Sequence, residues 1–273
     1  MTKKRRVVVT GLGCITPVGH RVADTWEALL KGKNGVDKIT RLDASKLSVQ
    51  IAAEVKNFSP DKYINSKEVR KIGLFIQYGI FAACEALEDA GLTGKFGVEG
   101  AVASIDPTRV GVNVSAGMGG LPEIQYWDRE LASKDKKTTS PFFITMIIPN
   151  MASGQISIMI NAQGPNQCIV TACASSSHGI GESFRQITRG DIDIMIAGGA
   201  EAVVCELGVA AFASMRALST RNDDPAHASR PYDKDRDGFV LGEGAGVLIL
   251  EEYEHAKKRG AKIYAEIIGY GAS

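Results

Sequence analysis

The sequence has 273 residues, of which 44% are hydrophobic and 23% are charged, and its formal net charge is +1. This composition is typical of a folded globular protein and excludes an intrinsically disordered chain. The near-zero charge excludes a global attraction to nucleic acid, so we expect no nucleic-acid partner. No stretch approaches the roughly 20 apolar residues of a membrane span, and the three apolar residues after the basic N-terminus are too few for a signal peptide.

The five cysteines are odd in number, scattered, and without a CxxC pair. This pattern argues against a disulfide framework and against a zinc site. It favours a reducing compartment, and we expect the protein to be cytoplasmic.

The chain begins with an apolar stretch at residues 6–10 that is typical of a short buried strand, and the glycines from Gly11 to Gly19 predict a turn. The turn does not match a dinucleotide fingerprint, because Thr16 stands where GxGxxG requires its third glycine. We therefore expect no cofactor.

Apolar residues recur at helical spacing from Ser66 to Ala90, which predicts one long helix. Its first turn carries Lys67, Arg70 and Lys71, and positive charge at a helix N-terminus opposes the helix dipole. Two interpretations stay open, a solvated first turn and a surface that binds an anionic partner.

Further along, residues 110–114 predict a strand that enters a glycine-rich turn, in which Met118 is the one bulky side chain. Residues 126–140 are polar and predict a loop, whereas residues 141–160 are densely apolar, which indicates burial or a subunit contact. Residues 192–197 predict another strand that enters glycines. The repeated order of strand, glycine turn and helix indicates an α/β fold with largely parallel strands.

The stretch from Cys168 to His178 predicts an apolar strand that turns through Cys173 directly into a helix. The free N–H groups and the dipole of a helix N-terminus favour a thiolate, and they can bind the oxyanion that forms when the thiolate attacks an acyl group. A small buried thiol that fills a gap in the core is an equal alternative from the spacing alone. His178 lies about 140° around the helix from Cys173, so we expect a structural role for it rather than a role as the base.

The run from Asp233 to Gly238 matches the first half of a calcium-binding EF-hand loop. Gly244 occupies the twelfth position, where such a loop requires a bidentate glutamate. We therefore predict no metal site.

Taken in order, eight motifs resemble the β-ketoacyl-acyl carrier protein synthases, the condensing enzymes of fatty acid synthesis, and in particular their elongating type II members. The resemblance extends from Arg6 to Ser273. Its most specific stretches are Val8–Gly13, Ser140–Phe143, Asn150–Gly154, Thr171–Ser175, Ala197–Glu201, Ala217–Asn222, Ser229–Asp233 and Asp237–Gly246.

The resemblance implies an α/β, thiolase-like fold, which is layered αβαβα in intact members of the family. Residues 1–260 would be the N-terminal half that carries the nucleophilic cysteine, and residues 261–273 would begin the C-terminal half. In relatives the second half supplies two histidines, a lysine and a Gly-Phe element, and this sequence has no counterpart of them. We therefore expect a truncated chain that is inactive in condensation by itself.

The resemblance also implies the roles of particular residues in a decarboxylating Claisen condensation, the reaction of a C-acyltransferase that elongates fatty acids. Cys173 would accept an acyl chain as a thioester from acyl carrier protein, and malonyl carrier protein would lose carbon dioxide and attack that thioester. The backbone N–H of Cys173 would form one side of the oxyanion hole. Met118 and Phe212 would form walls of the acyl pocket, with Phe143 contributed across the interface of a homodimer.

A basic docking surface for the acidic carrier protein would comprise Lys67, Arg70, Lys71 and Arg216. Two alternatives stay open. A non-catalytic subunit, either of the chain-length-factor type or one that only binds carrier protein, is disfavoured because chain-length factors lack the cysteine found here at Cys173. A polyketide-type ketosynthase is harder to separate by sequence.

Overall fold

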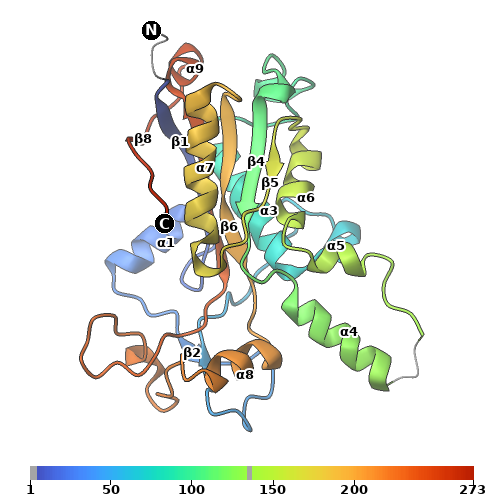
Figure 1. Cartoon of the computed structure of the whole chain (residues 1–273), viewed down its shortest axis with the longest axis vertical. Helices are drawn as coiled ribbons and strands as arrows, with labels where there is room; N and C mark the ends of the chain where they lie inside the picture. Colours follow the sequence, from blue (N-terminus) through green and yellow to red (C-terminus); the bar gives the residue numbers. More distant parts are fainter. Residues whose placement is uncertain (1–4, 134–136) are drawn as a thin grey trace.

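The computed structural model describes residues 5–133 and 137–273. A mixed six-stranded sheet with the order β5-β4-β6-β7-β1-β8 forms its centre, and β2 and β3 form a separate pair (Figure 1). The strands are β1 (Val7–Ile15), β2 (Asp37–Lys38), β3 (Ile51–Ala52), β4 (Val110–Ser115), β5 (Asn166–Gln167), β6 (Ile194–Glu201), β7 (Gly244–Glu252) and β8 (Ala265–Ile267).

Helices cover both faces of the sheet, which gives three layers. One face is covered by α7, and the other by α3 together with α6 (Figure 1). The helices are α1 (Val22–Leu30), α2 (Ser66–Val69), α3 (Leu74–Asp89), α4 (Leu121–Ser133), α5 (Phe143–Ile147), α6 (Met151–Ile160), α7 (Ser175–Arg189), α8 (Glu206–Ser214) and α9 (Tyr253–Lys258), with 3-10 turns at Gly100–Val102, Pro107–Arg109, Ala172–Ala174 and Pro225–His227. In the described part of the chain, no helix has the length and apolar character needed to cross a bilayer.

Strand directions agree only in part with the predicted parallel sheet. β4 pairs in parallel with β5 and with β6, as predicted. β7 runs antiparallel to both of its neighbours, β6 and β1, and β8 runs antiparallel to β1. The sheet is therefore mixed. The domain boundary at residue 260 stays a prediction. Beyond it, β8 pairs with β1 and so belongs to the same sheet as the preceding strands.

Gly11 and Gly13 belong to β1 rather than to a turn. The turn predicted from Gly11 to Gly19 is therefore wrong in its first part and is confined to residues 16–19, where the N–H of Thr16 donates to the carbonyl oxygen of Gly19 at 2.8 Å. A Cβ atom on Gly11 would lie 2.2 Å from the carbonyl oxygen of Ala86, and one on Gly13 would lie 1.9 Å from that of Ala82. Both partners belong to α3, which packs directly on the strand. The glycines are needed for this close packing of helix against sheet.

The helix predicted from Ser66 to Ala90 is also wrong, because the chain breaks at Gly73 into α2 and α3. A Cβ atom on Gly73 would lie 2.5 Å from the carbonyl oxygen of Met146. The first N–H of α3, on Leu74, donates to the Glu123 carboxylate at 3.0 Å. This contact satisfies one of the N–H groups that a helix start leaves without an intrahelical partner.

The break places two of the basic residues between helices. Arg70 and Lys71 lie after the end of α2 at Val69 and before the start of α3 at Leu74. Positive charge before the N-terminus of the 16-residue helix α3 still opposes its dipole, so both interpretations of these side chains stay open.

The segment predicted as a loop at residues 126–140 is helical up to Ser133, because Ile124, Trp127 and Leu131 repeat at helical spacing. α4 and α5 extend from the body of the molecule (Figure 1). The dense apolar segment at residues 141–160, which follows α4, forms α5 and α6. It is only partly buried, with Ile144 60% exposed and Ile158 73% exposed.

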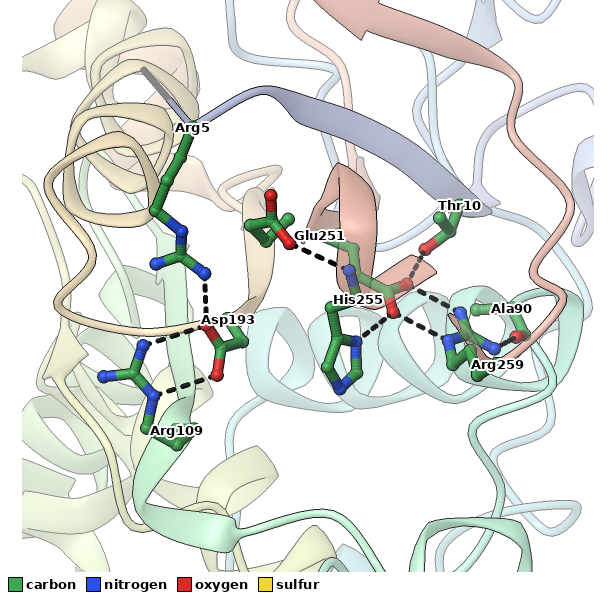
Figure 2. A network of polar contacts seen from close by, with 9 residues as sticks. Arg5, Thr10, Ala90, Arg109, Asp193, Glu251, His255 and Arg259 are labelled. Atoms are coloured by element: carbon green, nitrogen blue, oxygen red, sulfur yellow. Dashed lines mark hydrogen bonds and ion pairs between the residues drawn. The ribbon is translucent and has the colours of Figure 1, made fainter. Parts of the chain in front are cut away.

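A network of charged groups joins β7, α9 and α3 (Figure 2). Glu251 is fully buried, and its carboxylate accepts hydrogen bonds from Thr10, from His255 and from two nitrogens of Arg259 at 2.7 Å. Arg259 also donates to the carbonyl oxygen of Ala90 at the end of α3. Burial alone would raise the pKa of Glu251, but the hydrogen bonds from Arg259 and His255 outweigh burial and hold this pKa below its ordinary value.

Candidate active site

Cys173 is exposed and lies in the 3-10 turn Ala172–Ala174, immediately before α7 begins at Ser175. This placement at a helix N-terminus confirms the prediction. The strand predicted from Cys168 up to this turn is wrong, because residues 168–171 are irregular and the two-residue strand β5, Asn166–Gln167, ends before them.

The turn that carries the thiol has a strained backbone, since Ala172 has φ +52° in the left-handed region. The hydroxyl of Ser175 supports it on both sides. Its oxygen accepts a hydrogen bond from the N–H of Thr171 at 2.9 Å, and the hydroxyl donates to the carbonyl oxygen of Ala172 at 2.6 Å. Strain of this kind persists only where neighbouring contacts hold it, and here it presents Cys173 at the end of the helix.

Two glycines allow α7 to lie very close to the sheet. A Cβ atom on Gly199 of β6 would lie 1.9 Å from the hydroxyl oxygen of Ser176, and one on Gly179 would lie 2.9 Å from the hydroxyl oxygen of Ser115. The position of the cysteine turn over the ends of β4 and β6 therefore depends on the absence of side chains at these positions.

A cavity of about 600 Å³ opens beside Cys173. Its lining comes from the carboxyl ends of β1, β4 and β6, the beginning of β7 and the beginning of α7, and it is largely apolar. In open α/β sheets, ligands bind outside the carboxyl ends of the strands. The volume is typical of a site for a small molecule or for part of a larger one.

The structure brings two of the three predicted pocket residues to this cavity. Met118 and Phe212 line it together with Cys173, and the Phe212 ring meets Phe239 edge-on with centroids 5.5 Å apart. Phe143 does not line the cavity of its own chain. It lies on α5, where its ring contacts Trp127.

Two glutamates that sequence reasoning did not find also line the cavity. The Glu201 carboxylate accepts three backbone N–H bonds from the turn that carries Met118. The Glu243 carboxylate accepts hydrogen bonds from Arg41 and from Tyr78. Burial raises the pKa of both groups, and these donors oppose the rise. Each glutamate follows a glycine-rich stretch, but the sequence does not show its distant partners.

Histidine is absent from the described residues that line the cavity. His178 is outside the lining, and its Nδ1 lies 2.9 Å from the hydroxyl oxygen of Thr171. The imidazole therefore has the structural contact that its helical position predicts. A base for the thiol does not come from this side chain.

The predicted docking residues lie in two segments. Lys67 and Arg70 are exposed, whereas Lys71 is half-buried, bonds Glu68 at 2.7 Å and lies over the ring of Phe142. Arg216 is exposed just after α8 and lines a separate surface cavity with Arg230 and Arg236. Whether these residues form one docking surface stays a prediction.

Within residues 5–133 and 137–273, no group of histidine, cysteine or acidic side chains is arranged to hold a metal ion. In the segment that resembles half of an EF-hand, Asp233 instead pairs with Arg230 at 2.8 Å, and Asp237 accepts the N–H of Thr220 at 2.9 Å.

The mixed sheet with helices on both faces places the exposed thiol of Cys173 beside a largely apolar cavity. Residues 4–256 match the family model described as "Beta-ketoacyl synthase, N-terminal domain", and the chain belongs to this family. The match confirms the predicted family.

The particular relatives agree with this assignment. The chain is 50% identical over 270 residues to 3-oxoacyl-[acyl-carrier-protein] synthase 2 of Vibrio cholerae, a match that covers 99% of this chain and 63% of that protein. The crystal structure of a β-ketoacyl synthase from Burkholderia phymatum is similar with a TM-score of 0.84 at 35% identity, over 97% of this chain and 63% of that one. These likenesses confirm the predicted thiolase-like α/β fold.

A second similar structure is a type II polyketide ketosynthase in complex with its acyl carrier protein and bound to a hexaketide. It has a TM-score of 0.82 at 30% identity, over 98% of this chain and 63% of that one. The chain therefore spans 63% of the length of each of these three relatives.

Proposed function

We propose that the protein carrying this chain is a 3-oxoacyl-acyl carrier protein synthase, a C-acyltransferase that elongates fatty acids by decarboxylating condensation. The observation that carries the proposal is the exposed thiol of Cys173 on its strained turn, beside an apolar cavity of about 600 Å³. The Vibrio cholerae relative, 50% identical, bears this activity in its name. The identity to the polyketide ketosynthase is lower, at 30%, so the polyketide alternative has weaker support than fatty acid elongation.

In the first half of the reaction, the sulfur of Cys173 attacks the carbonyl carbon of an acyl thioester on the carrier protein. The carrier's thiol leaves with a proton, and the acyl group is then joined to Cys173. The backbone N–H of Cys173 stabilises the oxyanion of the tetrahedral intermediate. The alkyl chain lies in the cavity between Met118 and Phe212, where little polar surface is left unpaired, because the carboxylates of Glu201 and Glu243 already have donors.

In the second half, malonyl carrier protein loses carbon dioxide, and the resulting carbanion attacks the thioester carbon and expels Cys173 as a thiolate, which regains its proton from water. The lining residues that the structure describes include no histidine to assist the loss of carbon dioxide. We therefore propose that the 273-residue chain alone is acylated but does not condense.

The proposed partners are acyl carrier protein and a second copy of the chain. Docking of the acidic carrier on Lys67, Arg70, Lys71 and Arg216 is supported by the exposure of three of these four cations. A homodimer is supported by apolar surface next to the edge strand β5, where Ile144, Ile158 and Val170 are each more than half exposed. Phe143 on the neighbouring α5 would then face the partner's cavity. The five free thiols fit a cytoplasmic location.

The test is a condensation assay on the full-length protein with acyl and malonyl carrier protein. We expect Cys173→Ala to abolish formation of the 3-oxoacyl product. Cys168→Ala is the matched control, because Cys168 is half-buried five residues earlier, burial raises the pKa of its thiol, and it does not line the cavity. We expect this variant to keep its activity. Condensation by Cys173→Ala would contradict the proposal.

A further inference from the structure

We propose that Glu201 is a positioning residue that sets the acyl-chain length by fixing the turn at residues 117–119 and, with it, Met118. This inference rests on the proposed function in one respect, namely that an acyl chain occupies the cavity. No chemical step is assigned to the glutamate itself.

The Glu201 carboxylate accepts hydrogen bonds from three consecutive backbone N–H groups. Oε2 accepts from Gly117 at 2.7 Å and from Met118 at 2.9 Å, and Oε1 accepts from Gly119 at 3.0 Å. Successive N–H groups that converge on one anion form a concave anion-binding nest. Here the anion is a side chain of the same protein, fixed at the end of β6, so the nest is closed to any ligand.

The glycines on either side of Met118 are required by this arrangement. A Cβ atom on Gly117 would lie 2.9 Å from Oε2 of Glu201. Gly119 has φ +68°, a conformation that favours glycine, and a Cβ atom on it would lie 2.8 Å from the carbonyl oxygen of Ile147. Met118 is therefore the one side chain that this turn presents, and the carboxylate holds its backbone.

The turn is also in contact with the nucleophile's own turn. A Cβ atom on Gly117 would lie 3.3 Å from the carbonyl oxygen of Ala172, the residue before Cys173. Glu201 thus fixes Met118 relative to the point where the acyl chain is attached. Both Met118 and Glu201 line the cavity.

Movement of the Met118 backbone away from the cavity would separate the N–H groups of the turn from the partly buried carboxylate of Glu201. Hydrogen bonds to a charged acceptor are among the stronger ones in proteins, so the wall at Met118 resists displacement. An acyl chain long enough to reach this wall is therefore disfavoured relative to a shorter one.

The test compares acylation of Cys173 by short and long saturated acyl carrier protein thioesters in wild type, Glu201→Gln, Met118→Ala and the double variant. The glutamine has nearly the shape of glutamate, but its NH₂ group must face at least one N–H of the turn. We expect Glu201→Gln to lower the discrimination against long acyl chains by about tenfold. This is the lower end of the selectivity with which an apolar pocket distinguishes two ligands that differ by one methylene group. In the Met118→Ala background, Glu201→Gln should have no further effect on this ratio, because Glu201 acts through Met118.

Glu54→Gln is the matched control. Glu54 is a buried carboxylate that accepts the N–H groups of Thr40 and Arg41, and it does not line the cavity. We expect this variant to lose stability while keeping the wild-type ratio of long to short chains. Hydrogen exchange of the peptide that contains residues 117–119 should become faster in Glu201→Gln and stay unchanged in Glu54→Gln.

Three outcomes decide the matter. An unchanged chain-length ratio in a folded Glu201→Gln protein would overturn the inference, and so would an equal effect of Glu201→Gln with and without Met118. If wild type is not acylated at all, the proposed function fails instead. The affinities of free fatty acids of graded length, measured by calorimetry on the same variants, then still decide whether Glu201 controls the width of the cavity.

Discussion

The contact between α7 and β6 predicts a large effect for one added methyl group, in the variant Gly199→Ala. The new Cβ atom would lie 1.9 Å from the hydroxyl oxygen of Ser176, where apolar contacts normally keep about 3.5–4.0 Å. Rotation of the serine hydroxyl does not relieve the overlap, because the new atom would also lie 2.9 Å from the carbonyl oxygen of Ser115 and 3.0 Å from the Cβ of Ser176. The first turn of α7, which follows Cys173 directly, has to move.

Overpacking of this kind costs about 1–3 kcal/mol of unfolding free energy. For a protein of this size, each kcal/mol lowers the melting temperature by roughly 2–4 °C. We expect Gly199→Ala to show this loss in thermal and urea unfolding, and to be acylated at Cys173 more slowly than wild type. Both measurements are made on the same preparation.

The control for stability is Gly246→Ala. Gly246 pairs with Gly199 across the sheet, a Cβ atom added to it would meet no other atom within 4 Å, and its φ is not positive. We expect no loss of stability there, because a Gly→Ala change at a permissive site stabilises by about 0.4–1 kcal/mol through the unfolded chain. If Gly199→Ala has the melting temperature of wild type and is acylated at the wild-type rate, the close approach of α7 to β6 does not position the cysteine.

Two further predictions concern charge. Glu251→Gln leaves Arg259 without its buried partner and should cost about 3–5 kcal/mol near neutral pH, measured by urea unfolding. The folded-state pKa of Glu251 is lowered, so the stability difference between wild type and Glu251→Gln has its full size at pH values above the ordinary pKa of a glutamate. It shrinks as the pH falls through the lowered pKa. A stability difference that does not vary with pH would contradict the assignment. Arg70→Glu and Arg216→Glu should weaken carrier-protein binding in low salt, and the gap from wild type should narrow as salt increases; unchanged affinity for both variants would remove these residues from the docking surface.

Several features of the site were predictable because they depend on local sequence. The turn into α7 at Cys173 and the strand before Met118 follow from the order of apolar residues and glycines. The offset of His178 follows from helical geometry alone. Each of these predictions needed only neighbours within one turn or one strand.

Other features depend on contacts between distant residues, and these were predicted wrongly or not at all. In the sequence, Gly11 and Gly13 have the spacing of turn glycines. Their actual role depends on α3, about 70 residues later, which packs against them in the fold. The role of Glu201 requires knowledge that the end of β6 lies beside a turn 84 residues earlier. The helix α4 could have been predicted from Ile124, Trp127 and Leu131, whose spacing was hidden by the polar residues between them.

The proposed function depends above all on Cys173 being an acyl acceptor. The most direct measurement is peptide mapping by mass spectrometry after the 273-residue chain has been incubated with an acyl carrier protein thioester. We predict one acyl group on the peptide that contains Cys173, removable by hydroxylamine as a thioester is. The absence of an adduct, or an adduct on Cys168 with Cys173 unmodified, would contradict the claim.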